Sequence, residues 1–224
     1  MLFAFTGDDE GRHRALFEQM YRQRYEIYVK RRKWRALTPV GDQERDGFDT
    51  AAAVYLMVLD AQDEILAALR LLPTTVPHIL GDLFPQLAVD GVPCGPHILE
   101  LTRFYVTPLQ SSRAVRSWLV GVLCAGMIEY CLANNVRQIT SVIDTFLLKL
   151  MLSMEWRVRP LGLPRPYAEG EAVAVSVDMS PQILESTRRT KGVVGPVLAR
   201  PGVKAARIPA AIRTDVLVLA DLQP

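Results

Sequence analysis

The chain has 224 residues, of which 50% are hydrophobic and 22% charged, a composition typical of a soluble globular protein with a sizeable core. This excludes a disordered chain, a collagen-like repeat and a small disulfide-stapled scaffold. The 26 basic and 24 acidic residues nearly cancel, and a net charge of +2 argues against nucleic-acid binding by the whole surface. The length fits one large domain.

The cysteines, histidines and N-terminus indicate a cytoplasmic protein. Cys94, Cys124 and Cys131 form no C-x-x-C pair, and the three histidines form no H-x-x-x-H pair, so we expect no metal site. The N-terminal segment lacks the basic region of a signal peptide. The most apolar helical stretch, 118–128, is shorter than the ~18–20 residues of a membrane span. We therefore predict no membrane partner.

Hydrophobic periodicity predicts alternating strands and helices. In chain order we expect a strand at 2–5, a helix at 11–34, an acidic polar stretch at 38–50, strands at 52–59 and 65–72, and a short helix at 79–83. There follow a strand at 98–106, an apolar helix at 113–133 capped by Ser111 and Ser112, a strand at 139–143, a helix at 146–154, strands at 157–161 and 172–177, and a helix at 180–189 with Ser180 as its N-cap. Early hairpins and late crossovers predict an α/β fold with one mixed sheet flanked by helices. The domain would span residues 1–190, with 191–224 as a loosely packed tail.

Charged residues interrupt segments that are otherwise apolar. Arg70 lies inside one predicted strand, and Glu100 and Arg103 lie inside another. Buried charges are costly unless they are paired or face a polar cleft. Because Glu100 and Arg103 are three positions apart, a regular strand would point them to opposite faces, so a bulge or strand end is needed to bring them together. Nearby in the chain, three acids lie on a loop that precedes a strand: Glu44, Asp46 and Asp49. Such a loop by itself is commonly only solvated.

A basic segment ends the first predicted helix. Arg24 and Tyr28 lie on one helical face, and residues 30–33 form a cluster of Lys and Arg. Cations suit a helix C-terminus, and solvation alone would explain the cluster. The alternatives are a docking patch for an acidic carrier protein or phosphate-bearing ligand, and a nucleic-acid contact in a non-catalytic regulator.

These motifs together resemble the acyl-homoserine lactone synthases, the bacterial autoinducer synthases of quorum sensing. Arg24 and Trp34 are followed by ERDGFD (44–49), AVYL (53–56), LRLLPTTVPHIL (69–80), Phe84 and LELTRFYV (99–106). ITSVID (139–144) and WRVRPLGLP (156–164) extend the likeness to about residue 179. The resemblance implies a fold like that of GCN5-type N-acetyltransferases, with two strands splayed to admit a pantetheine arm. It also implies a set of signature positions: Arg24, Trp34, Glu44, Asp46, Asp49, Arg70, Phe84, Glu100 and Arg103.

Enzymes of this family acylate S-adenosylmethionine and then lactonise it with release of methylthioadenosine. That substrate carries a sulfonium, an ammonium and a carboxylate, so its pocket needs acids and arginines side by side. We expect Asp46 and Asp49 to hold the amine and Arg24 or Arg103 to pair with the carboxylate. Trp34 would cover the sulfonium. Arg70 and Phe104 complete the expected binding set, and Glu100, as base, with Glu44 and Asp46 form the expected catalytic set.

The acyl thioester would occupy the second half of the domain. We expect it to contact Tyr28, Phe84, Arg113, Thr140, Val142, Phe146, Leu147 and Met151. The family commonly has Phe where this chain has Tyr28, and the Gly-rich phosphate loop of acetyltransferases is replaced by 111–113 at a helix N-terminus. Tyr28 and 159–164 resemble synthases that take acyl-coenzyme A, whereas the basic cluster equally suits an acyl-carrier protein. No cofactor beyond these substrates is expected. The nearest alternative is an N-acyltransferase of the same fold that acts on another amine.

Overall fold

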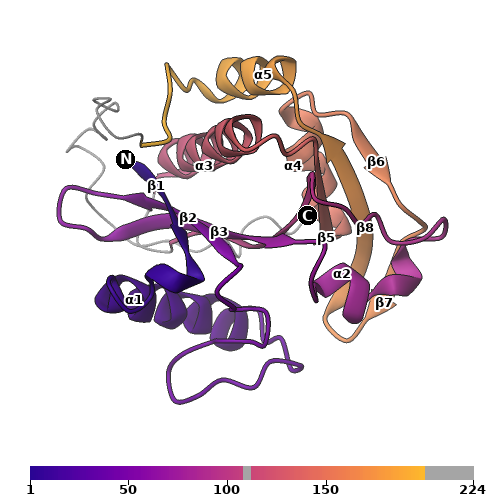
Figure 1. The fold of residues 1–224 in the computed structure, drawn as a ribbon, viewed down its shortest axis with the longest axis horizontal. Helices are drawn as coiled ribbons and strands as arrows, with labels where there is room; N and C mark the ends of the chain where they lie inside the picture. The colour runs from indigo at the N-terminus through magenta and orange to yellow at the C-terminus, as the bar shows by residue number, and fades with distance from the viewer. Residues whose placement is uncertain (108–111, 200–224) are drawn as a thin grey trace.

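Eight strands form one mixed sheet in the order β1-β2-β3-β4-β5-β8-β6, with β7 paired to β8 (Figure 1). The structure, a computed structural model, describes residues 1–107 and 112–199. The strands are β1 (Leu2–Thr6), β2 (Val54–Leu59), β3 (Ile65–Pro73), β4 (Ile98–Val106), β5 (Gln138–Asp144), β6 (Val158–Pro160), β7 (Arg165–Tyr167) and β8 (Gly170–Asp178). The helices are α1 (Arg14–Arg24), α2 (Ile79–Asp82), α3 (Arg113–Ala133), α4 (Leu148–Ser153) and α5 (Pro181–Lys191), and a π-helical segment, Tyr25–Arg31, continues α1. The predicted single mixed sheet is confirmed.

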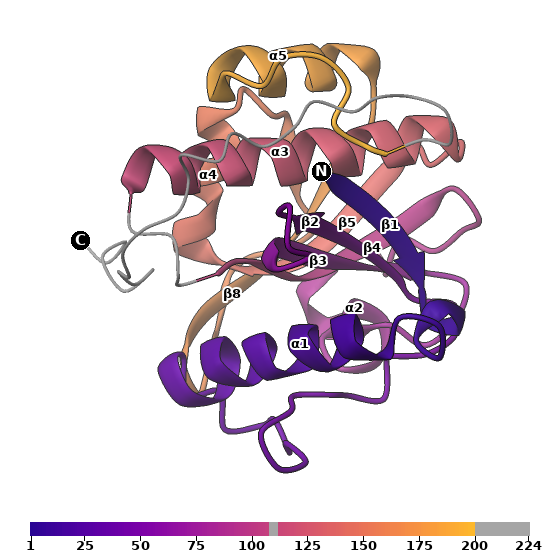
Figure 2. The ribbon, with the colours of Figure 1, turned by 90° about the vertical axis from the view of Figure 1, so that its left-hand side faces the viewer.

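The two faces of the sheet are covered by different helices (Figure 2). Helix α1 covers one face, and α3 covers the other with α5 outside it. Strand β2 shows how the sequence permits this, because all of its residues are buried. Leu56 and Val58 pack on the α3 side, whereas Tyr55 and Met57 pack on the α1 side. A strand buried on both faces is expected to be continuously apolar.

Several predicted elements differ in detail. The helix expected at 11–34 begins at Arg14 and changes to π-helix after Arg24, and Trp34 lies beyond its end. A π segment widens the turn by one residue, which changes where its side chains point, and such segments are frequent at functional sites. Strand β7 was not predicted from the sequence because it has only three residues and one of them is proline. Ser180 caps α5 as predicted.

Helix α3 has the predicted bounds but a different cap. Ser112 occupies the N-cap position and makes no side-chain capping bond, and Ser111 lies outside the described residues. The whole helix of 21 residues is long and apolar enough to cross a membrane, by length and composition only. The expectation that the apolar stretch is too short for a span was based on residues 118–128 alone. Much of the helix is buried against the sheet. A Cβ at Gly126 would lie 2.4 Å from Leu2 Cδ1, so this glycine permits the close approach of helix and strand.

Strands β4 and β5 run parallel and are paired only at their beginnings. Ile98–Glu100 pairs with Gln138–Thr140. Beyond these residues β4 continues to Val106 and β5 to Asp144 without further pairing to each other. Each strand instead keeps its other neighbour, β3 and β8 respectively. The sheet is therefore split between its two halves, as the family resemblance implied.

Residues after α5 return to the sheet. Ala199 N–H donates to Leu2 O at 2.8 Å, and the Glu129 carboxylate of α3 accepts the backbone N–H groups of Val197 and Leu198. Val193, Val197 and Leu198 are buried in the core. The tail expected to be loosely packed from residue 191 is thus packed as far as residue 199, because its apolar side chains cover the α3 side. Residues 200–224 of that predicted tail lie outside the described part.

Candidate active site

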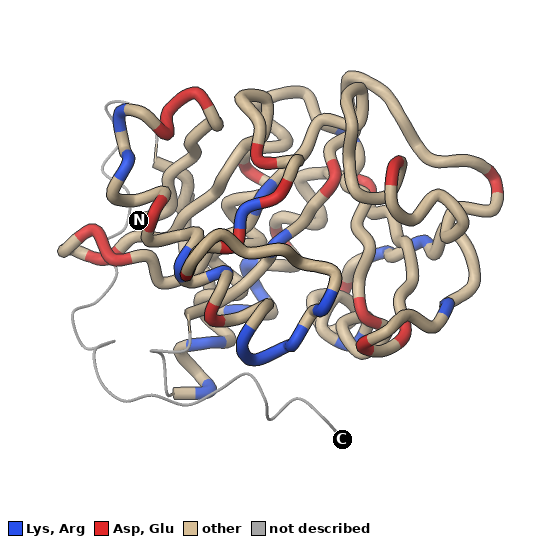
Figure 3. The backbone as a smooth tube through the Cα atoms, turned by 90° about the horizontal axis from the view of Figure 1, so that it is seen from below, with Lys and Arg blue, Asp and Glu red and all other residues tan. Residues whose placement is uncertain are grey.

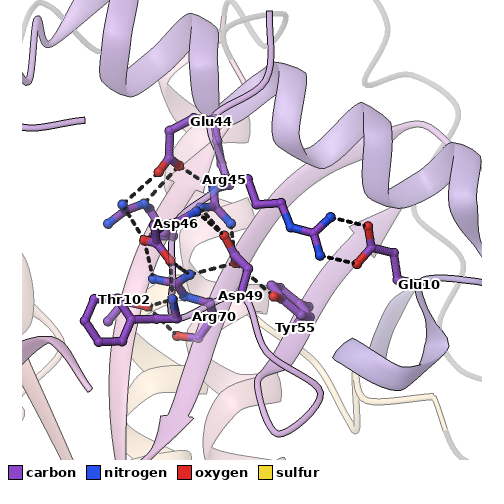
Figure 4. Close-up of polar contacts among 11 residues, drawn as sticks. Glu10, Glu44, Arg45, Asp46, Asp49, Tyr55, Arg70 and Thr102 are labelled. Atoms are coloured by element: carbon purple, nitrogen blue, oxygen red, sulfur yellow. Dashed lines mark hydrogen bonds and ion pairs between the residues drawn. The ribbon is translucent and has the colours of Figure 1, made fainter. Parts of the chain in front are cut away.

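Three arginines and three acids form one ion-pair network on the α1 side of the sheet (Figure 4). The arginines come from three elements, at the end of α1, in β3 and in β4, and the acids come from the loop that precedes β2. The members are Arg24, Arg70, Arg103, Glu44, Asp46 and Asp49. The tertiary structure therefore brings together the charged signature residues that the family resemblance implied, with one exception, Glu100.

Arg24 lies at the buried end of this network. Its Nε donates to Glu44 Oε2 at 2.6 Å, and its Nη1 and Nη2 donate to the two oxygens of Asp49 at 2.8 and 2.9 Å. Asp49 also accepts the hydroxyl proton of Tyr55 at 2.9 Å. Bidentate, charge-assisted bonds of this kind offset the desolvation of buried ions. Each of the three Arg24 side-chain nitrogens and both oxygens of Asp49 therefore have a partner within the protein.

Arg70 connects the acids to the middle of the sheet. Its Nη1 lies 2.6 Å from both Asp46 Oδ1 and Asp49 Oδ1, and its Nη2 lies 2.9 Å from Asp46 Oδ2. Its Nε donates to Thr102 Oγ1 at 3.0 Å. Sequence reasoning missed Thr102 and Tyr55. For Thr102 the available signal was a polar residue beside Arg103 in a largely apolar strand. For Tyr55 no such signal existed, because every residue of β2 is buried.

A bulge in β4 places Arg103 in the network. Arg70 is paired with Thr102 and Ala68 with Tyr105, so two residues of β4 oppose one of β3. Arg103 has a φ of 50°, a left-handed conformation that is uncommon for a non-glycine residue. Its Nη2 donates to Glu44 Oε1 and Asp46 Oδ2, both at 2.8 Å. The structure thus has the bulge that the sequence analysis considered, but the bulge turns Arg103 toward Glu44 and Asp46 and does not bring it to Glu100.

The network keeps Glu44 and Asp49 ionised. Burial by itself raises the pKa of Glu44, but the hydrogen bonds from Arg103 and the charges of Arg24 and Arg103 outweigh it and lower the pKa to about 2. Burial likewise raises the pKa of Asp49, and the charges of Arg24 and Arg70 more than reverse the effect, so the pKa is far below its usual value. These carboxylates therefore act as anions and not as proton donors near neutral pH.

Only one side of the network reaches solvent. The side chains of Arg24 and Asp49 are 1% and 0% exposed, whereas those of Asp46 and Arg103 are 17% and 7% exposed. The expectation that Asp49 holds the substrate amine and that Arg24 binds its carboxylate does not fit this arrangement, since both side chains are buried and paired with each other. Asp46 and Arg103 form the accessible rim.

Aromatic side chains flank that rim. Tyr28 of the π-helical segment stacks on Trp34, with ring centroids 4.8 Å apart. The Arg103 guanidinium carbon lies 5.4 Å from the Tyr28 ring and 5.8 Å from the Trp34 ring. The Tyr28 hydroxyl donates to the backbone carbonyl of Phe104 at 3.0 Å. The Phe104 ring packs on the core of the α3 side, so the structure does not place it with the other predicted binding residues.

Glu100 lies apart from the network, at the start of α2. It is fully buried, and its two oxygens accept the backbone N–H groups of Ile79 and Leu80 at 2.7 and 2.8 Å. Burial raises the pKa of Glu100 to about 7, although these two N–H groups and His78 act in the opposite direction. A carboxyl group with such a pKa can exchange a proton near neutral pH. Its neighbour across the sheet is Thr140 of β5.

Comparison with known proteins decides the family. The family model described as autoinducer synthase matches residues 8–186. The isovaleryl-homoserine lactone synthase of Bradyrhizobium diazoefficiens is 30% identical over 186 residues, which is 83% of this chain and 83% of that protein. This chain belongs to the autoinducer synthase family.

Solved structures agree with this assignment to the autoinducer synthases. The CoA-dependent acyl-homoserine lactone synthase MesI has a TM-score of 0.80 and 34% identity, and the match covers 89% of this chain and 99% of that chain. BjaI, described with S-adenosylmethionine and isopentyl-CoA, has a TM-score of 0.80 and 28% identity over 93% of this chain and 95% of its own. A protein from Lactobacillus plantarum described as an N-acetyltransferase, 12% identical with a TM-score of 0.54, shares the fold alone. The expected acetyltransferase-like fold is confirmed.

The residues predicted to contact the acyl donor do not gather in one place in this autoinducer synthase. Phe84 and Val142 pack together with Leu80 and Leu87 beside α2. Met151 is buried in the core of the α3 side, away from that group. Phe146 is 44% exposed, Leu147 is half-buried, and Arg113 is exposed at the first position of α3. Thr140 is fully buried.

Three buried polar atoms near this region make no hydrogen bond within the described part of the chain. They are Thr140 Oγ1, Ser176 Oγ and His78 Nε2. Thr140 and Ser176 are paired across β5 and β8, which places both hydroxyls on one row of the sheet with Glu100. Among residues 1–107 and 112–199, no cluster of three or more His, Cys, Asp and Glu side chains is arranged to hold a metal ion.

Proposed function

We propose that this protein transfers an acyl group from a thioester to the amine of S-adenosylmethionine and then closes the lactone, releasing methylthioadenosine, for quorum sensing. The observation that carries the proposal is the ion-pair network, whose accessible rim presents Asp46, Arg103 and Trp34 side by side. Such a rim offers an anion, a cation and an aromatic face, which suit a ligand with an ammonium, a carboxylate and a sulfonium. BjaI has been described with S-adenosylmethionine and with methylthioadenosine, which supports the same reading.

In this proposal the buried members support the rim and do not bind substrate. Arg24 and Asp49 hold the loop that carries Asp46, and Glu44 holds the guanidinium of Arg103. The amine of the substrate would lie against Asp46 and its carboxylate against Arg103. Because both partners are held by further ion pairs, their geometry is set before the substrate arrives, which lowers the entropic cost of binding.

Acyl transfer needs the substrate ammonium to lose a proton before it attacks the thioester carbon. Glu100 remains the proposed base, since its pKa of about 7 lets it accept a proton near neutral pH. Both of its oxygens are already bonded to backbone N–H groups, so the proton would reach it through water. Lactonisation then joins the carboxylate oxygen to the γ-carbon as the carbon–sulfur bond breaks, with methylthioadenosine as a neutral leaving group. Holding the carboxylate close to the γ-carbon accounts for most of the acceleration of this lactonisation step.

We further propose acyl-coenzyme A as the donor, in preference to acyl-carrier protein. Both MesI and BjaI are described as CoA-dependent, and Tyr28 lies where the family commonly has Phe. The protein would act in the cytoplasm, where its substrates are made; Cys94, Cys124 and Cys131 are all free thiols, which suits a reducing compartment.

The test is to incubate the purified protein with S-adenosylmethionine and matched sets of acyl-CoA and acyl-carrier-protein thioesters. We expect methylthioadenosine release with acyl-CoA, and mass spectrometry should identify the lactone and its chain. Asp46→Asn should lose most of this activity, while Glu155→Gln, which alters an exposed ion pair on the other side of the sheet, should retain it. Absence of methylthioadenosine with every donor would contradict the proposal.

Two alternatives predict other outcomes. A simple N-acyltransferase of the same fold would acylate another amine without forming methylthioadenosine. A nucleic-acid regulator would bind DNA in a salt-dependent manner through residues 30–33. In the view of Figure 3, acidic and basic residues are both spread along the chain, and the net charge is only +2, which does not favour the regulator.

A further inference from the structure

The segment of residues 28–35 spans the split between β4 and β5. We call it the bridging segment. It follows α1 and comprises the end of the π-helical stretch and the residues after it. One end is bonded to β4 and the other to β5 and the β7–β8 turn, so it connects the two halves of the sheet at the place where their own pairing has stopped.

The first anchor is on β4. The Tyr28 hydroxyl donates to Phe104 O, in the part of β4 that lies beyond its pairing with β5. The Tyr28 side chain is buried, and its ring stacks on the ring of Trp34. This end of the bridging segment is therefore tied to the rim of the ion-pair network.

The second anchor is on the other half of the sheet. Arg32 Nη1 donates to Asp144 Oδ2 at 3.0 Å, and the Tyr167 hydroxyl donates to the other oxygen of Asp144. Arg35 N–H donates to Glu169 Oε1 at 2.8 Å. Asp144 ends β5, and Tyr167 and Glu169 lie in β7 and the turn after it. The side chains of Arg32 and Asp144 are 30% and 12% exposed, so this is a partly buried contact between distant parts of the chain.

Arg32 also contacts one aromatic side chain from each half. Its guanidinium carbon lies 5.7 Å from the Trp34 ring and 5.9 Å from the Phe146 ring. Trp34 belongs to the proposed S-adenosylmethionine side, and Phe146 follows β5 on the proposed acyl side. One planar cation thus touches a group from each of the two substrate regions, and Asp144 determines where that cation lies.

We propose that Arg32 and Asp144 are positioning residues that hold the bridging segment across the split sheet and so orient Trp34 and Phe146 relative to each other. This inference rests on the proposed function, because both substrates must meet in the split for acyl transfer. Neither residue has to touch the reacting atoms. Their contribution is to keep the two substrate regions in register, where small displacements have large effects on rate.

The test compares Arg32→Ala, Asp144→Asn and the double variant with wild type. We expect kcat/KM for the acyl thioester to fall roughly 10- to 100-fold in each single variant. The double variant should be no worse than the poorer single variant, because the same contact is already lost. Arg189→Ala is the matched control, since it also removes an arginine from an ion pair, here with Glu155 in an exposed place. It should leave kcat/KM within about twofold of wild type.

If Arg32 and Asp144 had only a structural role, their variants would have lower melting temperatures but an unchanged kcat/KM for the acyl thioester. We expect the melting temperatures of both single variants to stay within about 2 °C of wild type. In both single variants, the affinity for S-adenosylmethionine alone, measured by calorimetry, should fall by a smaller factor than kcat/KM for the acyl thioester. Additive losses in the double variant, or a kcat/KM equal to that of Arg189→Ala, would overturn the inference.

Hydrogen exchange separates this inference from the proposed function. Amide exchange in residues 28–35 should become faster in Arg32→Ala and in Asp144→Asn but not in Arg189→Ala, whether or not the wild-type protein makes lactone. If the variants show this exchange pattern but the wild-type protein releases no methylthioadenosine, the proposed function is contradicted and the role of Arg32 and Asp144 in holding the bridging segment is supported. Unchanged amide exchange of residues 28–35 in Arg32→Ala and Asp144→Asn would overturn the inference that these residues hold the bridging segment.

Discussion

Arg24 of α1 and Asp49 of the loop before β2 form a bidentate ion pair that solvent does not reach, with Nη1–Oδ1 and Nη2–Oδ2 distances of 2.8 and 2.9 Å. The pair joins the helix to the loop that supplies all three acids of the network. A ligand could reach either group only by breaking this pair and leaving the other charge buried. Its position therefore favours a supporting role, with substrate contact left to Asp46 and Arg103.

Asp49→Asn should destabilise the fold strongly. The change removes the anion that faces Arg24 and Arg70, and breaking a buried pair costs about 3–5 kcal/mol because the partner charge is left unpaired. Urea denaturation followed by circular dichroism measures the free energy of unfolding. Glu18→Gln, which affects the exposed pair with Arg14, should cost less than about 1 kcal/mol. Equal losses in the two variants would contradict the assignment.

Stability should fall as the pH is lowered from about 4.5 to 2. The pKa of Glu44 is lowered in the folded state from 4.5 to about 2, so the unfolded chain binds a proton in this window that the folded protein does not. The shift corresponds to roughly 3 kcal/mol of stability at neutral pH. Denaturation midpoints measured across this range should drop less in Glu44→Gln than in wild type. A parallel pH dependence would argue against an ionised, paired Glu44.

Glu100→Gln should lower turnover far more than affinity for S-adenosylmethionine. Because the pKa of Glu100 is about 7, wild-type kcat should rise with pH through this value as the base ionises, and the variant should lack that rise. Steady-state rates from pH 5.5 to 8.5 measure this. Equal losses of turnover and affinity would make Glu100 a binding group.

Glu100 should also affect stability with the opposite sign to Glu44. Its pKa is raised in the folded state, so the folded protein keeps a proton that the unfolded chain has released between about pH 4.5 and 7. The contribution of Glu100 is therefore complete below about pH 4.5 and is lost as the pH rises through 7. Denaturation of wild type and Glu100→Gln at pH 5 and pH 8 measures the difference. A variant with the same pH trend as wild type would contradict the raised pKa.

Trp34→Ala should weaken the affinity for S-adenosylmethionine by about tenfold, which corresponds to roughly 1.4 kcal/mol and lies within the range of a desolvated cation–π contact. Trp34→Phe should keep most of the affinity, because it retains an aromatic face that can stack on Tyr28. Calorimetric titration with S-adenosylmethionine measures both variants. Equal affinities for Ala and Phe variants would show that the aromatic face is not used.

Local patterns were sufficient for most of the secondary structure and for the identity of the charged residues. Helix α3 has the predicted bounds because it is long and apolar, and β3 and β4 were recognisable as apolar runs despite Arg70, Glu100 and Arg103. The change from α- to π-helix after Arg24 was not predictable, since it depends on where Tyr28 and Trp34 find partners in the rest of the fold.

The pairing of the charged residues could not be obtained from their spacing. The sequence placed Glu100 and Arg103 together as candidates, but the bulge in β4 sends Arg103 to Glu44 and Asp46 and leaves Glu100 at the start of α2. Thr102 and Asp144 were missed because each forms its decisive contact with a segment far away in the chain. Tyr55 bonds to Asp49, six residues earlier, but nothing in its apolar strand marks its hydroxyl as part of the site.

The sequence by itself determined the fold class, the family and most of the charged and aromatic residues that the site uses, because periodicity and motif order can be read along the chain. Only the tertiary structure decided which of those residues are sealed in the core and which reach the rim, and which segment joins the halves of the split sheet. The reason is that burial and ion pairing depend on contacts such as those of Arg24 with Asp49 and Arg32 with Asp144, whose partners lie far apart in the chain.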